Sequence, residues 1–248
     1  MRRLAAAFLL LATLQLPAWA GEIRVYAAAS LANALAAVKT GYERLHPDDV
    51  VTPVFAASGA LLSRMDGGAA CDVFISADPD TMTMAVDKRR VDPASRTVIA
   101  GNTLVLAVPA GNPAHVTGLA ALSQGGVQRI GVGNPESVPA GRYAKRALQR
   151  QALWFALTSK LVYYPSVRHV LAAVEKGEID AGFVYATDAA IAGAAVATAA
   201  VVPLSPPVTY TAAVAAKAAN ARGAAAFLAY LVTPEARAAL ARFGFDAP

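Results

Sequence analysis

Cysteine and histidine are both scarce in this sequence. Cys71 is the only cysteine among 248 residues, so no disulfide can form within the chain, and we expect it to be a small buried residue. The three histidines, His46, His115 and His169, form no recognisable arrangement with the candidate serines Ser30 and Ser58, and no G-x-S-x-G motif is present. Because a serine nucleophile needs a base beside it, a serine-dependent hydrolase is only a remote alternative. We expect a protein that is not an enzyme.

A strong excess of either charge is also missing. The chain carries 22 Lys and Arg against 17 Asp and Glu, which gives a net charge of +5 at pH 7. Its basic residues form no cluster interleaved with aromatics, and this argues against nucleic-acid binding. Asp72, Asp78 and Asp80 match no cation-binding loop, because Pro79 interrupts them. We therefore predict no cofactor and no direct ligands for a metal cation, and we expect Asp78 to cap the helix that Pro79 starts.

Long hydrophobic runs are absent after residue 20, so the rest of the chain contains no convincing membrane span. The first twenty residues are typical of a secretory signal peptide. They contain Arg2 and Arg3, an apolar run at residues 4–16 that is too short to cross a bilayer, and an A-x-A cleavage site ending at Ala20. The residue directly after this site is Gly21 and not a cysteine, so no lipid anchor is expected. The mature chain, starting at Gly21, is predicted to be soluble and exported.

The stretch from Ile23 to Leu45 shows how the mature chain is organised. A short apolar run ends at Ser30, and the apolar residues that follow recur at spacings of three and four. This periodicity predicts a strand and then an amphipathic helix packed on a sheet, with Ser30 as a candidate N-cap. The unpaired N–H groups and the dipole at the start of such a helix favour an anion beside the hydroxyl.

Comparable strand-to-helix junctions recur along the chain, and the four of interest hold Ser30, Ser58, Ala140 and Val167. Ser58 follows a β-rich run at residues 50–55. Ala140 follows Pro139, which suits the first turn of a helix, and Ser166 is the expected cap of the helix beginning at Val167. Taken alone, each serine is more simply explained as a cap than as a ligand. The repetition favours one anion site built from several helix N-termini.

Two segments are predicted to cross between lobes. Residues 96–109 are a β pattern too long for one strand and broken at Gly101-Asn102, and residues 201–207 contain three prolines. Strands that alternate with helices predict an α/β fold with mainly parallel sheets flanked by helices. We assign residues 21–100 and 208–248 to lobe I and residues 101–207 to lobe II. Ligands of such sheets bind beyond the carboxyl ends of the strands, so a cleft between the lobes unites the four junctions.

Seven stretches carry a resemblance to a known family. In chain order they are VYAAASL, FAASGAL, DVFISAD, GNTLVLAVP, NPESVPAGRYAKRAL, SVRHVLAAVEKGEIDAGFVYATDA and FLAYLVTPEARAALARFGF. No single stretch is decisive, but their order and spacing from about Glu22 to Phe245 together are specific. The sequence resembles the periplasmic molybdate-binding proteins, the solute receptors of molybdate ABC importers.

This resemblance implies a two-lobed type II periplasmic-binding fold with a two-strand hinge. It implies high-affinity binding of molybdate or tungstate in the periplasm, closure of the lobes over the oxyanion, and delivery to the membrane permease of an ABC importer. The implied ligand contacts are the hydroxyls of Ser30, Ser58 and Tyr185 and the backbone N–H groups of Ala140 and Val167. We expect a monomer.

The donor set is consistent with this implication. A fully deprotonated tetrahedral dianion has only acceptors, and hydroxyls and amides offer it donors, whereas hydrogen phosphate carries a proton that needs an acceptor. Arg168 is expected to face outward or to brace its loop. A ferric-iron receptor would use tyrosines, but Tyr163 and Tyr164 are adjacent on a strand and point to opposite faces. A sulfate receptor has an equally suitable donor set and stays the main alternative.

Overall fold

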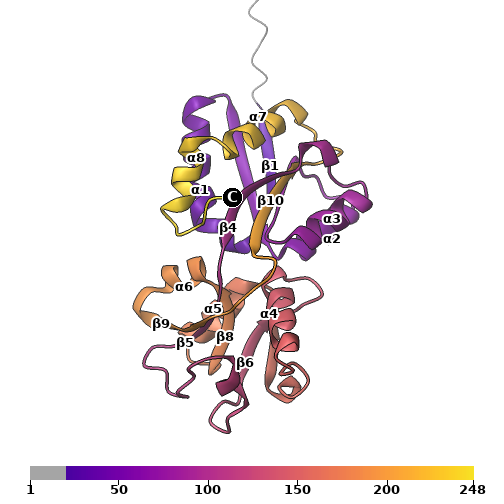
Figure 1. Ribbon diagram of the computed structural model, residues 1–248. Helices are drawn as coiled ribbons and strands as arrows, with labels where there is room; N and C mark the ends of the chain where they lie inside the picture. Colours follow the sequence, from indigo (N-terminus) through magenta and orange to yellow (C-terminus); the bar gives the residue numbers. More distant parts are fainter. Residues whose placement is uncertain (1–20) are drawn as a thin grey trace, which may run out of the picture.

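Two five-stranded sheets form the framework of the fold (Figure 1). The computed structural model describes residues 21–248, and the predicted signal peptide at residues 1–20 lies outside the described residues. The first sheet has the strand order β2-β1-β3-β10-β4, and the second has the order β7-β6-β8-β5-β9. Each sheet forms one lobe together with its helices, and Figure 1 shows lobe I above lobe II.

Lobe I combines the first part of the chain with its C-terminal part. Its strands are β1 (Gly21–Ala28), β2 (Asp49–Ala56), β3 (Val73–Ser76), β4 (Thr97–Asn102) and β10 (Val208–Val214). Its helices are α1 (Ala32–Leu45), α2 (Ser58–Asp66), α3 (Pro79–Asp87), α7 (Ala221–Leu231) and α8 (Pro234–Ala241), and a single 3-10 turn, η1 (Ala29–Leu31), precedes α1.

Lobe II is formed by the middle of the chain. Its strands are β5 (Leu104–Pro109), β6 (Ile130–Gly133), β7 (Leu161–Tyr164), β8 (Ala181–Tyr185) and β9 (Val196–Val201). Its helices are α4 (Pro139–Arg150), α5 (Val167–Glu175) and α6 (Ala186–Ala192).

The core of lobe I lies on both faces of its sheet. Successive residues of a strand point to opposite faces, and β1 shows the result. Ile23 and Val25 are buried with Leu35 of α1, whereas Tyr26 is buried with Leu61 of α2. The apolar spacing that predicted α1 therefore corresponds to a helix packed on the sheet. Cys71 is 5% exposed, which confirms it as a buried residue, and burial raises the pKa of its thiol to about 12.

The two crossings lie between the lobes. Thr103 alone separates β4 from β5, immediately after the predicted break at Gly101-Asn102, and residues 202–207 connect β9 to β10. Gly101 pairs with Thr209 in the sheet of lobe I, so β4 continues two residues beyond residue 100, where we had ended lobe I. In Figure 1 both connections run from one lobe to the other side by side.

The sheets are mixed, with more antiparallel pairing than the sequence indicated. β10 is antiparallel to both β3 and β4, and β5 is antiparallel to both β8 and β9, while the pairs of β1 and of β6 are parallel. The reason is the hinge: β5 and β10 are the strands by which the chain enters a lobe, so they run away from the cleft. β9 was missed altogether, because the alanine-rich segment 189–200 has no strand-like alternation.

Candidate functional site

All five predicted site residues line one cavity between the two lobes. Its walls are Ala28, Ala29, Ser30, Ala56, Ala57, Ser58 and Ala77 from lobe I, and Val138, Pro139, Ala140, Ser166, Val167 and Tyr185 from lobe II. The lobe I residues lie at the carboxyl ends of β1, β2 and β3, and those of lobe II follow β6, β7 and β8. The topology therefore brings the four strand-to-helix junctions together, as the sequence predicted.

The two serines do not cap helices, and that part of our prediction is wrong. The turn after β1 tightens into η1, so α1 starts at Ala32 and the Ser30 hydroxyl lies 2.7 Å from Tyr210 Oη instead. Ser58 is itself the first residue of α2, and its Oγ accepts a hydrogen bond from the N–H of Ala77 at 3.1 Å. Both hydroxyls are buried, with 1% and 0% exposure, at the cavity wall.

The prediction that the Ser166 side chain caps α5 is also wrong. It occupies the N-cap position of α5, but its side chain accepts no capping bond; its Oγ lies 2.8 Å from Nδ1 of His169, one turn further along the same helix. This local Ser–His pair joins the N-cap residue of α5 to the first turn of that helix, and it involves neither Ser30 nor Ser58. By contrast, Asp78 caps α3 as predicted, because its Oδ1 accepts from the N–H of Thr81 at 3.1 Å.

Two helices of lobe II begin at the cavity. Pro139 is the first residue of α4 and Ala140 the second, while Val167 is the first residue of α5. The N–H groups of a helix's first turn have no partner within the helix, and the helix dipole places partial positive charge there. Gly141 lets α4 approach β6, because a Cβ at this position would collide with the carbonyl oxygen of Gly133. The amides of Ala140 and Val167 are thus available to an anion.

Tyr185 contributes a third hydroxyl. It ends β8, is 1% exposed, and its Oη has no hydrogen-bond partner within residues 21–248. Burial raises the pKa of this phenol well above its ordinary value, and neighbouring Tyr210, Tyr143 and acidic residues raise it further. The hydroxyl therefore stays protonated, and it is a hydrogen-bond donor that lacks an acceptor. Buried polar atoms without a partner are rare in folded proteins, and each calls for a specific explanation.

No charged side chain lines the cavity within the described part of the chain. The nearest buried carboxylates are already paired. Asp78 forms an ion pair with Arg142 at 2.7 Å, and Asp188 forms one with Arg168 at 2.7 Å. Burial raises the pKa of Asp188 to about 6, against the opposing effect of Arg168. Arg168 also donates to the backbone oxygen of Ser30 in lobe I at 3.2 Å, so it connects the two lobes instead of facing outward or bracing its own loop, as we had predicted.

The lobes are closed around this space. Arg142 of α4 reaches Asp78 of lobe I, and the N–H of Gly59 donates to the carbonyl oxygen of Ser137 across the cleft at 2.9 Å. The cavity left between the closed lobes is small, with a volume of about 10 Å³, so only a compact ligand suits it.

Sequence and structure comparisons agree with this architecture. A family model for bacterial extracellular solute-binding proteins matches residues 23–246. The chain belongs to this family. It is 40% identical over 233 residues to the molybdate-binding protein ModA of Escherichia coli (strain K12), with 91% of this chain and 89% of that protein covered. The family resemblance predicted from the sequence is therefore confirmed.

Solved structures give the same fold. The periplasmic molybdate-binding protein of Azotobacter vinelandii has a TM-score of 0.77 at 22% identity, covering 91% of this chain and 99% of that one. The sulfate-binding protein SubI from Mycobacterium tuberculosis H37Rv has a TM-score of 0.79 at 18% identity, covering 91% and 86%. At these identities the likeness concerns the fold alone.

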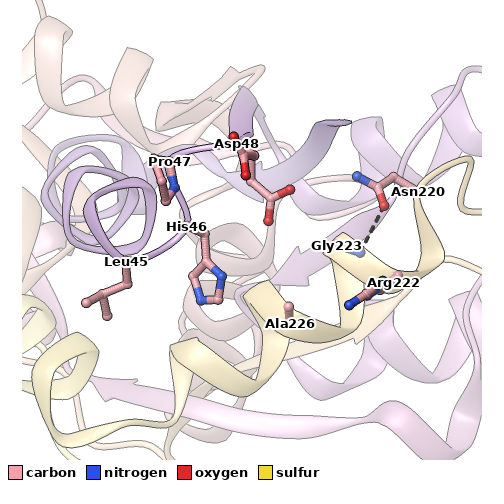
Figure 2. A pocket seen from close by; sticks show the side chains of 9 residues that line it. Leu45, His46, Pro47, Asp48, Asn220, Arg222, Gly223 and Ala226 are labelled. Carbon is pink, nitrogen blue, oxygen red and sulfur yellow. Dashed lines mark hydrogen bonds between the residues drawn. The ribbon is translucent and has the colours of Figure 1, made fainter. Parts of the chain in front are cut away.

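Like the cavity, a second hollow of this solute-binding protein contains polar groups, but it does not suit an anion. It has a volume of about 310 Å³ and lies in lobe I between the end of α1 and the start of α7 (Figure 2). Asp48 and Asp49 line it together with Arg222, so its two carboxylates outnumber its one guanidinium. Asn220 lies at its edge and already caps α7 through the N–H of Gly223, drawn as a dashed line in Figure 2.

Residues 21–248 contain no group of three or more His, Cys, Asp and Glu side chains arranged to hold a metal ion. None of the helices in the same range combines the length and the hydrophobicity that a membrane crossing requires.

The sequence did not reveal the residues that support the cavity wall or join the two lobes beside it. Tyr210, Asn102 and the pair Asp78–Arg142 contact either a site residue or the facing lobe. Their partners are 64 to 180 positions away in the sequence, and no local periodicity encodes such distances. Only Asp78 could have been suspected from the sequence, because a residue that caps a helix next to the cleft is also close to the opposite lobe.

Proposed function

We propose that this protein binds molybdate, and tungstate equally well in chemical terms, in the cavity between its lobes. The single observation that carries the proposal is the donor set of that cavity. The hydroxyls of Ser30, Ser58 and Tyr185 and the first-turn amides at Ala140 and Val167 face one small space that no charged side chain lines. A fully deprotonated tetrahedral dianion has only acceptors, so every ligand oxygen can be matched by a donor.

The charge of the ion is balanced by helix N-termini rather than by cations. Helix dipoles and oriented amides stabilise an anion, and the absence of Arg and Lys from the cavity wall leaves the ion free to leave when the lobes open. The ion pairs Asp78–Arg142 and Asp188–Arg168 keep nearby carboxylates from repelling it. This arrangement suits a receptor that must bind and then release its ligand.

The biological role follows from this chemistry and from the relatives. We infer that the mature chain, in the periplasm, closes its lobes over the oxyanion and delivers it to the membrane permease of an ABC importer. The molybdate-binding protein of Escherichia coli, 40% identical, supports the ligand class. The two crossings supply the hinge for the movement.

A sulfate receptor is the second candidate, because a sulfate-binding protein shares the fold with a TM-score of 0.79 and the donor set suits sulfate as well. Isothermal titration of the mature protein with molybdate, tungstate, sulfate and phosphate separates the two. We expect tight binding of molybdate and tungstate and much weaker binding of sulfate. Equal affinity for sulfate and molybdate would overturn the proposed preference.

A further inference from the structure

A buried chain of hydrogen bonds connects the hinge to Ser30. The side-chain amide Nδ2 of Asn102, the last residue of β4, lies 2.9 Å from Thr187 Oγ1 and 3.3 Å from Tyr210 Oη. Tyr210 Oη in turn lies 2.7 Å from Ser30 Oγ, at the wall of the cavity. Asn102, Thr187, Tyr210 and Ser30 are all at most 5% exposed, so water does not compete for these groups.

The orientation of the Asn102 amide is fixed by its other end. Its Oδ1 accepts a hydrogen bond from the backbone N–H of Thr103 at 2.8 Å. A backbone N–H is always a donor, so the oxygen must face Thr103 and the NH₂ group must face Tyr210. Asn102 is therefore a donor to Tyr210.

The hydrogen bond between Tyr210 and Ser30 has a defined direction, with Tyr210 as the donor. Tyr210 Oη accepts from Asn102, and the only acceptor within reach of its own proton among the described residues is Ser30 Oγ. Burial raises the pKa of Tyr210, so that proton is present. When Ser30 Oγ accepts the proton of Tyr210, the hydrogen of Ser30 itself must point elsewhere, and the cavity lies beside it.

The Ser58 hydroxyl is likewise oriented by a hydrogen bond, in this case from the backbone. Its Oγ accepts the backbone N–H of Ala77 at 3.1 Å, and this bond leaves the Ser58 hydrogen free for the cavity. Each serine oxygen therefore has one of its two lone pairs engaged on the side away from the cavity, Ser58 by the N–H of Ala77 and Ser30 by Tyr210, so neither serine hydrogen can point to that side.

We propose that Tyr210 and Asn102 are positioning residues that keep the Ser30 hydrogen directed at the cavity, so that the cavity favours fully deprotonated oxyanions over oxyanions carrying a proton. This inference rests on the proposed oxyanion-binding function and deepens it. A fully deprotonated dianion finds donors on every side. Hydrogen phosphate, of similar size to sulfate, must place its P–OH hydrogen against a donor, and an unmatched buried donor is costly.

The test is Tyr210→Phe, which removes the hydroxyl and keeps the ring. Ser30 Oγ is then released from accepting, and it can turn its hydrogen away and offer a lone pair to P–OH. Sulfate and phosphate are the probes, because at about pH 8 they differ chiefly by one proton. Each is titrated in competition with bound molybdate. We expect the preference for sulfate over phosphate to shrink by about five- to tenfold, the value of one neutral hydrogen bond.

Tyr42→Phe is the matched control. Tyr42 is a fully buried tyrosine of lobe I whose Oη donates to Asp49 at 2.6 Å, away from the cavity. Its loss lowers stability and leaves the sulfate-to-phosphate ratio unchanged. If Tyr210→Phe leaves the ratio at the value of the wild type and of Tyr42→Phe, the positioning role is refuted.

A second variant keeps the test decisive if Tyr210→Phe does not fold. Asn102→Ala retains the tyrosine but removes the donor that directs it, so Tyr210 can accept from Ser30, and we expect the ratio to change in the same direction. An unchanged ratio in a folded Asn102→Ala protein refutes the role equally. Failure of the wild type to bind molybdate at all is a different result, and it would overturn the proposed function itself.

Discussion

Ser58→Ala separates ligand binding from stability at one position. Ser58 Oγ accepts the N–H of Ala77, and the hydroxyl is fully buried beside the cavity. The substitution leaves that N–H without its acceptor, which costs about 1–3 kcal/mol of the free energy of unfolding. It also removes a donor to a buried dianion. A hydrogen bond to a charged group is worth roughly 1.5–3 kcal/mol, so the dissociation constant for molybdate should rise roughly ten- to a hundredfold.

The assay pairs calorimetric titration with thermal unfolding of the ligand-free protein. Thr233→Ala is the control, because Thr233 Oγ1 caps α8 through the N–H of Ala236, and α8 lies on lobe I away from the cavity wall. Loss of a helix cap costs about 0.5–2 kcal/mol of stability, and the affinity should not change. Ser76 is a poorer control, since its Oγ donates to Asp78, which pairs across the cleft.

The two effects of Ser58→Ala are thus expected together, whereas Thr233→Ala shows only the first. A Ser58→Ala protein that is less stable but binds molybdate as tightly as the wild type would show that Ser58 is no ligand and acts only as the acceptor for the N–H of Ala77.

Three further predictions follow from the same geometry. Tyr185→Phe removes a buried hydroxyl without a partner, so molybdate affinity should fall at least tenfold while the unfolding midpoint of the ligand-free protein is kept or raised; a lowered midpoint with normal affinity would contradict this. Gly59→Ala places a Cβ 2.7 Å from the backbone oxygen of Ser137 in the opposite lobe, so the lobes of this variant should not close fully. Molybdate should bind more weakly and should no longer lower the radius of gyration in small-angle scattering, as we expect it to do for the wild type. A normal fall in the radius of gyration of the variant would contradict this prediction. Molybdate affinity should be constant from about pH 7 to pH 9, because burial raises the pKa of Tyr185 well above its ordinary value and the other donors do not titrate; a tenfold fall by pH 9 in a titration series would show that a donor is lost.

The sequence predicted local features of the site well because their causes are local. The break at Gly101-Asn102, the cap at Asp78 and the strand-to-helix junctions depend on neighbours within a few positions. Once a chain alternates strands and helices, the geometry of the sheet places those junctions at one edge. This is why five residues taken from both lobes line the same cavity.

The partners of the serine hydroxyls were not predictable in this way. Ser30 was expected to cap its own helix. Because the turn after β1 tightens, its hydroxyl is hydrogen-bonded instead to Tyr210, which lies 180 positions later in the sequence. Ser58 meets Ala77, which the parallel pairing of β1 with β2 and with β3 brings alongside. These contacts depend on how distant segments pair in the fold, and short sequence patterns do not predict that pairing.

We infer that one oxyanion lies between the lobes and is held by donors alone. The decisive measurement is a crystal structure of the mature protein with molybdate, with anomalous data collected at the molybdenum edge. We expect a single strong peak in the cavity, with ligand oxygens within hydrogen-bond distance of the hydroxyls of Ser30, Ser58 and Tyr185 and of the amides of Ala140 and Val167. A peak in the hollow beside Asp48, or no peak between the lobes, would contradict the account.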